Sequence, residues 1–416
     1  MKQFFTLFIA ILAVTFFAGC HNKGSSAPAP TNVSVVAGEN RATVTWDMLP
    51  GIQYWVFKAA TPDITPENCL GTPECQIFTN VASPYLVASL ANGTLYSFTV
   101  NGRTDSGPGG PGSPSIQAIP RPAGGLWSVS TPVTGLNDLR GVTHSSIFVA
   151  VGTSGTLLTS ADGLAWTTQT APSPLTNFNA ITYGGTYVAV GTGGVLLTSA
   201  DAVNWTQATN ASTNTLYAVT TNGAGEYVAT GASGTIINNS VGGWNLATSI
   251  PVGTPTLNGV AYGNGKYVAV GAGGSVLTSD TYGNNWTSVN ATVTLPTSDL
   301  KSIAYGPGVG ATGPATNATG TFVAAGASGS VVSSTDGGLT WGAPASFAPG
   351  IQINAVTYGS QFIAVADNGS IYYSTNGVNW TLATSSPANG SPVYAVVHGF
   401  YDYSAVGAAG LNMHSQ

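Results

Sequence analysis

Charged side chains are scarce in this chain, and their scarcity excludes several classes of function. Asp, Glu, Lys and Arg together make up 6% of the 416 residues, against roughly a quarter in an average protein. Lys and Arg number only nine, and the net charge is -6. Nucleic-acid binding and polybasic attachment to a membrane both need a cationic surface. We therefore exclude both.

Helical periodicity is also missing after the first twenty residues, which leaves strands and turns as the expected structure. Hydrophobic residues make up 43% of the chain, enough for a core, and Gly numbers 55. Thr, Ser, Asn and Val stand where Lys and Glu usually stand, and these residue types favour strands and turns. The composition predicts an all-β protein.

The first twenty residues have the pattern of an export signal. Lys2 is followed by an apolar run, Phe4 to Phe17, that is too short for a comfortable membrane span. Ala18-Gly19-Cys20 resembles the bacterial lipobox, which implies that residues 1–19 are a lipoprotein signal peptide and that Cys20 is lipidated. The position after Cys20 is His21, not Asp, which resembles lipoproteins that are sorted to the outer membrane. The resemblance implies an outer-membrane lipoprotein, on either the periplasmic or the cell-surface face. An ordinary signal peptide with an incidental Cys is the alternative.

Cysteine is rare, with three in all. If lipid occupies Cys20, Cys69 and Cys75 remain as an even pair in an exported chain, which predicts a disulfide. No CxxC motif is present, and we expect neither a metal nor a cofactor.

Residues 20–30 read as a Pro-containing tether, and short alternating runs begin at Thr31. Residues 31–119 resemble a fibronectin type III domain through Trp46, Leu90 and Tyr96-Ser-Phe98-Thr-Val100. The resemblance implies a non-catalytic β-sandwich in which the Tyr96 hydroxyl bonds back to the chain upstream. Residues 120–125 read as a hinge.

Seven tryptophans recur almost periodically after the hinge, at spacings of 39, 39, 39, 42, 55 and 39 residues. Four short strands per roughly forty residues is the pattern of a propeller blade. The first strand that carries one of these tryptophans precedes any complete repeat, and the last repeat has no such strand. Residues 126–416 therefore predict a seven-bladed propeller closed by its N-terminal outer strand. A stacked solenoid is the alternative, but it would need polar end caps. The tryptophans are Trp127, Trp166, Trp205, Trp244, Trp286, Trp341 and Trp380.

Three of the turns before these tryptophans resemble Asp-box (BNR) repeats: Ser334-Thr-Asp336-Gly-Gly-Leu-Thr-Trp341, Ser160-Ala-Asp162-Gly-Leu-Ala-Trp166 and Ser374-Thr-Asn376-Gly-Val-Asn-Trp380. Two others depart from the pattern, because Ala202 follows Asp201 and the turn before Trp244 lacks the Asp. Such repeats occur in sialidases and in photosystem II assembly factor propellers. We interpret the repeats of this chain as structural. The sialidase arginine triad cannot be built, because the propeller region has one Arg, Arg140, and one Glu, Glu226. The arginine-rich surface of the assembly factors is missing too. A carboxylate pair for glycoside hydrolysis is not selected by spacing among Asp138, Asp201, Asp280, Asp299, Asp367 and Asp402.

Two histidines, His144 and His398, occupy a position held by Tyr in other repeats. A zinc site needs further ligands, which the repeat frame does not supply, so we interpret them as aromatic packing.

The more informative set is the second residue of each first strand, because first strands line the channel of a propeller. We predict that these residues bind a polar, mostly neutral ligand, a glycan or an envelope protein, in a non-catalytic scaffold. A glycan-active hydrolase and a purely structural envelope component are the alternatives. The insertion Gly306 to Gly320 has no assigned role. The predicted binding residues are Arg140, Asn179, Tyr217, Asn258, Lys301, Asn354 and Tyr394.

Overall fold

The computed structural model describes residues 26–104, 107–130, 137–172, 176–209, 211–240, 242–279, 282–289, 295–307, 320–384, 386–399 and 402–415. The chain forms two compact units that divide between Pro120 and Arg121. The expected signal peptide 1–19, the lipidation site Cys20 and most of the Gly306 to Gly320 insertion lie outside the described residues. Within the described ranges, no helix is long and apolar enough to cross a membrane.

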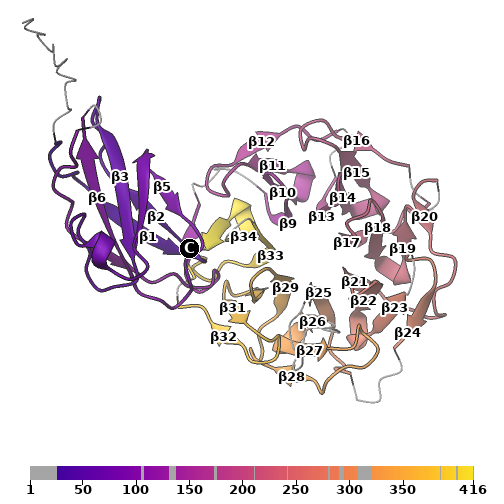
Figure 1. The fold of residues 1–416 in the computed structure, drawn as a ribbon. Coiled ribbons are helices and arrows are strands. Elements are labelled where there is room, and N and C mark those ends of the chain that lie inside the picture. The colour runs from indigo at the N-terminus through magenta and orange to yellow at the C-terminus, as the bar shows by residue number, and fades with distance from the viewer. Residues whose placement is uncertain are drawn as a thin grey trace, which may run out of the picture. The chain divides into compact units, whose positions relative to one another are not determined.

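The first unit is a sandwich of two antiparallel sheets (Figure 1). Alternate residues of each strand point inward, so that Val44, Val56, Phe98 and Val100 pack in one core with no exposed surface. The Tyr96 hydroxyl accepts the Ala91 N–H at 3.1 Å, which is the upstream bond expected of that residue. One sheet has the order β1 (Ser34–Gly38), β2 (Arg41–Thr45), β5 (Tyr85–Val87). The other has the order β4 (Gln76–Val81), β3 (Gln53–Ala59), β6 (Tyr96–Arg103), β7 (Ile116–Ala118).

A loop between β3 and β4 contains the short turn η1 (Cys69–Gly71) and a disulfide between Cys69 and Cys75. Cys69 is fully buried against Phe57 and Ile64 in a small second core. The disulfide and this core hold the long loop against the outer face of β3.

The second part of the expected tether is packed on the sandwich. Ser26 forms a β-bridge with Arg103, and Ala27 is 4% exposed. A side chain at Gly110 would overlap the Ala27 carbonyl oxygen, so the glycine permits this close approach. Of the segment 20–30, residues 26–30 therefore belong to the sandwich.

The second unit is a ring of seven four-stranded antiparallel sheets (Figure 1). The first strands are β9 (Leu139–His144), β13 (Phe178–Tyr183), β17 (Leu216–Thr221), β21 (Leu257–Gly263), β25 (Leu300–Gly306), β29 (Ile353–Tyr358) and β33 (Val393–His398). The second strands are β10 (Phe148–Gly152), β14 (Tyr187–Gly191), β18 (Tyr227–Gly231), β22 (Lys266–Gly271), β26 (Thr321–Gly326), β30 (Phe362–Ala366) and β34 (Tyr403–Gly407).

Third and fourth strands complete each sheet. The third strands are β11 (Leu157–Ser160), β15 (Leu196–Ser199), β19 (Ile236–Asn238), β23 (Val276–Ser279), β27 (Ser330–Ser334), β31 (Ile371–Ser374) and β35 (Asn412–Ser415). The fourth are β12 (Thr167–Gln169), β16 (Thr206–Gln207), β20 (Asn245–Leu246), β24 (Trp286–Ser288), β28 (Ala345–Ser346), β32 (Thr381–Leu382) and β8 (Trp127–Val129). In six of the seven sheets a single 3-10 turn joins the second strand to the third; the sheet of β30 and β31 is the exception. The turns are η2 (Thr153–Gly155), η3 (Thr192–Gly194), η4 (Ala232–Gly234), η5 (Ala272–Gly274), η6 (Ala327–Gly329) and η7 (Ala408–Gly410).

The ring closes through the N-terminal strand of the propeller. Each first strand contacts the first strands of its two neighbours, and β33 contacts β9. β8 pairs with β35, with Ser415 opposite Trp127 and Met413 opposite Val129. The all-β fold class and the closure by an N-terminal outer strand are therefore confirmed.

The closing strand is held by the residues just before it. The Gln361 amide donates to the Ala123 carbonyl at 2.7 Å, and the Thr384 N–H donates to the Gly125 carbonyl at 3.2 Å. The Trp127 indole donates to the Gly124 carbonyl at 2.8 Å. Of the segment 120–125 expected as a hinge, residues 123–125 are thus fixed to the propeller. We call residues 123–130 the clasp.

The Asp-box turns are held by hydrogen bonds within the turn. The Asp162 carboxylate accepts the N–H groups of Leu164 and Ala165 at 2.8 and 3.0 Å, and the Trp166 indole donates to the Gly163 carbonyl. Burial raises the pKa of Asp162, but these bonds outweigh burial and hold the pKa below its usual value. The boxes close hairpins on the ring's periphery.

Candidate binding site at the channel mouth

All seven predicted binding residues line one cavity of about 560 Å³ at the mouth of the central channel, together with Thr256, Ala272, Asp299 and Gln352. A narrower space of about 260 Å³ continues below it between the first strands. The mouth lies on the face that carries the connections between sheets, because each first strand begins there.

A β-bulge in every sheet explains why these residues converge. The first residue of each first strand is a buried aliphatic or aromatic side chain, at most 2% exposed. In each sheet the ladder then skips one residue: Phe178 pairs with Gly191 and Ala180 with Val190, leaving Asn179 without an opposite partner. The skipped residues in the other six sheets are the other six predicted residues. A bulge redirects the extra side chain, here into the mouth.

The bulge also accounts for glycine at the end of most second strands. A Cβ at Gly152 would overlap the carbonyl oxygen of Asp138, and one at Gly191 would overlap that of Asn177. These carbonyls belong to the residues just before each first strand. The glycines therefore let the start of the first strand pack closely against the end of the second strand.

The three asparagines bind neighbouring sheets to one another. The amide nitrogens of Asn179, Asn258 and Asn354 donate to the carbonyls of Leu216, Leu300 and Val393, at 2.8, 2.8 and 2.9 Å. Each acceptor is the first residue of the next first strand. The amides therefore support the ring, each worth about 1 kcal/mol net.

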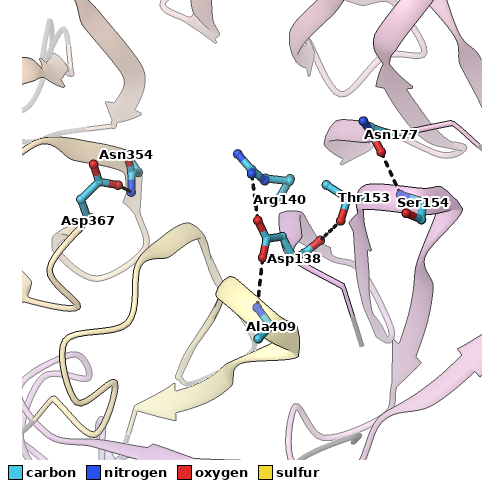
Figure 2. Close-up of polar contacts among 8 residues, drawn as sticks. All are labelled: Asp138, Arg140, Thr153, Ser154, Asn177, Asn354, Asp367 and Ala409. Atoms are coloured by element: carbon cyan, nitrogen blue, oxygen red, sulfur yellow. Dashed lines mark hydrogen bonds and ion pairs between the residues drawn. The ribbon is translucent and has the colours of Figure 1, made fainter. Parts of the chain in front are cut away.

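Asn354 is more fully engaged than the other two. Its nitrogen also donates to the Asp367 carboxylate at 2.7 Å (Figure 2), and its oxygen accepts from the Gln352 amide at 2.8 Å. This side chain is the part of the predicted site least able to turn toward a ligand.

Both cations of the mouth face carboxylates, which the sequence prediction left out of the site. The Arg140 guanidinium lies 2.9 Å from an oxygen of the Asp138 carboxylate, and the Lys301 ammonium lies 3.0 Å from an oxygen of the Asp299 carboxylate. Asp-Leu-Arg and Asp-Leu-Lys are the same spacing in two sheets, so the pattern was present in the sequence. With Asp367, three carboxylates stand against two cations at this mouth.

These carboxylates also connect sheets. The second Asp138 oxygen accepts the Ala409 N–H at 3.1 Å (Figure 2), and the second Asp299 oxygen accepts the Gly273 N–H at 3.0 Å. The Asn177 oxygen accepts the Ser154 N–H in the same way, at 2.9 Å. The Gly273 N–H and then the Lys301 ammonium hold the pKa of Asp299 below its usual range.

Two tyrosines supply the aromatic surface. The Arg140 guanidinium lies 4.2 Å from the centre of the Tyr394 ring, a cation–π contact. Burial, followed by the nearby Asp138 carboxylate, raises the pKa of Tyr394, so its hydroxyl stays protonated. Tyr217, 39% exposed, stands in the part of the mouth formed by the neutral residues Asn179 and Asn258.

The two histidines lie outside this mouth, at the far end of their strands. The His144 ring packs 4.3 Å from Phe148, and the His398 ring 4.8 Å from Tyr403. Burial, and then the charge of His398, lowers the pKa of His144. Among the described residues, no group of three His, Cys, Asp or Glu is placed to hold a metal ion.

A larger hollow of about 600 Å³ lies away from the channel, between Thr192–Val195 and Gln207–Thr209. Its lining consists of glycines, short hydroxyl side chains, one amide and two small aliphatic residues, with no titratable group. We favour the channel mouth as the site because diverse side chains converge only there among the described hollows.

No protein-family model and no curated protein matches the sequence. Solved structures do match the fold. A structure described as YCF48 bound to D1 peptide has 17% identity and a TM-score of 0.55 over 69% of this chain and 96% of that chain. YCF48 from Cyanidioschyzon merolae has 18% identity and a TM-score of 0.53, over 69% and 98% of the two chains. The WD40 β-propeller domain of Doa1 has 9% identity and a TM-score of 0.54, over 70% and 97%. At these identities the likeness establishes a β-propeller fold.

Proposed function

We propose that this protein is an exported, lipid-anchored binding module whose propeller holds a polar ligand at the channel mouth. The observation that carries the proposal is the convergence on one cavity of seven bulge residues of four different types, Arg, Lys, Asn and Tyr, since one repeated residue type would serve a purely structural ring as well. The match to a propeller structure with a bound peptide supports a protein partner.

The charge arrangement narrows the ligand. Each cation of the mouth already faces a carboxylate, and Asp367 adds a further negative charge. An anionic ligand would have to displace those carboxylates, so we propose an uncharged ligand or one that carries positive charge. A polar segment of an envelope protein and a neutral glycan both satisfy this condition.

Substitutions at the mouth test the proposal once a screen of envelope proteins and neutral glycans has identified a ligand. We expect Tyr217→Ala to weaken binding about tenfold, because it removes an exposed aromatic surface. Tyr282→Ala is the matched control: Tyr282 is 55% exposed and lies in a hairpin on the opposite face. Equal affinities of the two variants would place the ligand elsewhere.

A glycoside hydrolase remains the alternative from the sequence. Such an enzyme needs a carboxylic acid with a raised pKa, whereas the pKa of Asp299 is lowered. Turnover in a screen of fluorogenic glycosides, abolished by Asp299→Asn, would replace the binding proposal with catalysis.

For the remainder of the chain, we propose a lipoprotein of the outer membrane, anchored at Cys20, with a fibronectin type III spacer between anchor and propeller. The lipobox-like segment supports the anchor, and the sandwich with its Tyr96 hydrogen bond supports the spacer. The mass of the mature N-terminal peptide tests the anchor: a diacylated Cys20 is expected, and an unmodified peptide would contradict it. Protease treatment of intact cells reports which side of the membrane the propeller faces.

A further inference from the structure

The sandwich carries an exposed apolar pair at one end. Met48 and Leu49, 49% and 53% exposed, lie in the loop between β2 and β3. The Met48 sulfur accepts the Ser83 N–H at 3.3 Å, which fixes the loop against its neighbour. Isolated exposed apolar residues are common, so the pair acquires meaning only from its position.

This end is also where the chain enters the sandwich. Residues 27–31 and Leu49 line the same small cavity of about 120 Å³, together with Ile52 and Tyr54. Ser26 is bridged to Arg103, at the end of β6 on the same side. The chain leaves at the opposite end, after β7, because Ala118 pairs with the first residue of β6.

The connection to the lipid anchor is short. Six residue steps separate Cys20 from Ser26, and a fully extended chain advances about 3.4 Å per step, so the anchor lies within about 20 Å of Ser26. The apolar pair is therefore held close to the lipid surface, at high effective concentration.

Charge favours the same orientation. The β1–β2 turn and the β3–β4 loop both lie at the far end of the sandwich, opposite Met48 and Leu49. They contain four described acidic residues: Glu39, Asp63, Glu67 and Glu74. At the near end the described charges are Asp47, which accepts bonds from Thr31 and Asn32, and Arg103, whose guanidinium lies 3.2 Å from the Trp55 ring centre. Among the described residues, the near end thus carries one acid and one cation, whereas the far end carries four acids against the two cations Arg41 and Lys58. The near end therefore approaches anionic headgroups at lower cost.

We propose that this end of the sandwich docks on the phospholipid surface that holds the anchor, with Met48 and Leu49 inserted among the headgroups. The inference rests on the proposed lipidation of Cys20. Apolar side chains at the interface lose contact with water, and the docked sandwich directs its opposite end, where the chain continues to the propeller, away from the bilayer.

A fluorophore at single cysteines tests the docking in the full lipidated protein. Cys20 carries lipid and Cys69 is bonded to Cys75, so an introduced cysteine is the one free thiol. Met48→Cys and Leu49→Cys are compared with Ile119→Cys, a control that is 49% exposed at the opposite end of the same sandwich. Each labelled protein is bound to vesicles of phosphatidylethanolamine and phosphatidylglycerol, with and without brominated acyl chains.

We expect emission at positions 48 and 49 to shift to the blue and to be quenched by brominated lipid, with neither change at 119. Vesicle-bound protein with all three probes equally unquenched would overturn the docking and leave the anchor intact. A blue shift without quenching would mean that a protein covers the pair, which also overturns the proposal. Failure of the mature protein to float with vesicles would refute the anchor, and the docking with it.

Discussion

The clasp leads to a prediction that separates closure of the ring from ordinary packing. Trp127 is 4% exposed and packs among Ile363, Val393, Tyr403 and Met413. Truncating a buried Trp costs about 3–5 kcal/mol, and loss of the indole bond to Gly124 is part of that cost. We expect Trp127→Ala to lower the unfolding free energy of the propeller by about 4 kcal/mol.

Trp286→Ala provides the matched control. Trp286 is 2% exposed, and its indole donates to the Gly283 carbonyl at 2.8 Å, the same geometry as Trp127. Its strand, however, follows the third strand of its own sheet directly in sequence. Both substitutions should cost similar free energy, but only Trp127→Ala should release the strand that closes the ring.

Urea unfolding and amide hydrogen exchange measure the two effects. In Trp127→Ala, amides of β35 (Asn412–Ser415) that pair with β8 should exchange much faster, while β23 stays protected. In Trp286→Ala, the loss of protection should be confined to β23 and β24. Equal protection of β35 in the two variants, or a cost at Trp127 below about 1 kcal/mol, would refute the role of the clasp.

Three further predictions concern stability. Asn258→Ala removes the bond to the Leu300 carbonyl and should destabilise the propeller by about 1–2 kcal/mol in urea unfolding, whereas an effect near zero would show that the amide does not support the ring. Burial raises the pKa of Asp336, but hydrogen bonds from neighbouring residues outweigh it and leave the pKa lowered, so its stabilisation is complete above the unfolded-state pKa of about 3.9 and is lost as pH falls from there through the lower folded-state pKa. Asp336→Asn should therefore be less stable than wild type at about pH 6, and the difference should shrink as pH falls below about 3.9; a constant difference would contradict the sign. Replacing Cys69 and Cys75 by Ser should destabilise the sandwich by about 2 kcal/mol and leave the calorimetric transition of the propeller unchanged.

The sequence predicts the ring well because each repeat encodes its own geometry. The buried first residue of each first strand, the glycine that ends most second strands and the Trp before the fourth strand recur in register, so independent copies support one alignment. Closure also follows from local signals, since the chain has one surplus Trp strand at the start and one missing at the end.

The sequence predicts which residues line the mouth, but it does not predict how their charges are paired. Periodicity identifies Arg140 and Lys301 as residues of the mouth, yet it does not say what neutralises them. The answer lies two residues upstream, at Asp138 and Asp299, where a bulge turns both side chains of the pair toward the same space. Alternation along a regular strand would also bring residues two apart together, so the spacing could have been used.

The boundaries of the units are the least accessible to sequence reasoning. A stretch of Ala, Pro and Ser such as residues 26–30 looks like a free tether, because its affinity for the sandwich comes from backbone contacts to Arg103 and Gly110. Residues 123–125 likewise contain no hydrophobic pattern, and yet Gln361 and Thr384 hold their carbonyls. Contacts through the main chain leave little trace in the composition of the segment that makes them.

The two roles of the mouth residues constrain each other. Asn179, Asn258 and Asn354 sit in alternate sheets and donate one N–H across a seam, so three of the seven seams are tied at the level where a ligand would bind. A ligand that competed for these N–H groups would have to loosen the ring, at a cost of about 1 kcal/mol per bond. A ligand avoids this cost by using the second N–H or the carbonyl oxygen of Asn179 and Asn258, or by using the residues of the intervening sheets, for which the described hydrogen bonds include none to the next strand. Arg140, Tyr217, Lys301 and Tyr394 are those residues. Arg140 is engaged by Asp138 and Tyr394, and Lys301 by Asp299, whereas Tyr217 is 39% exposed and offers its ring to a ligand.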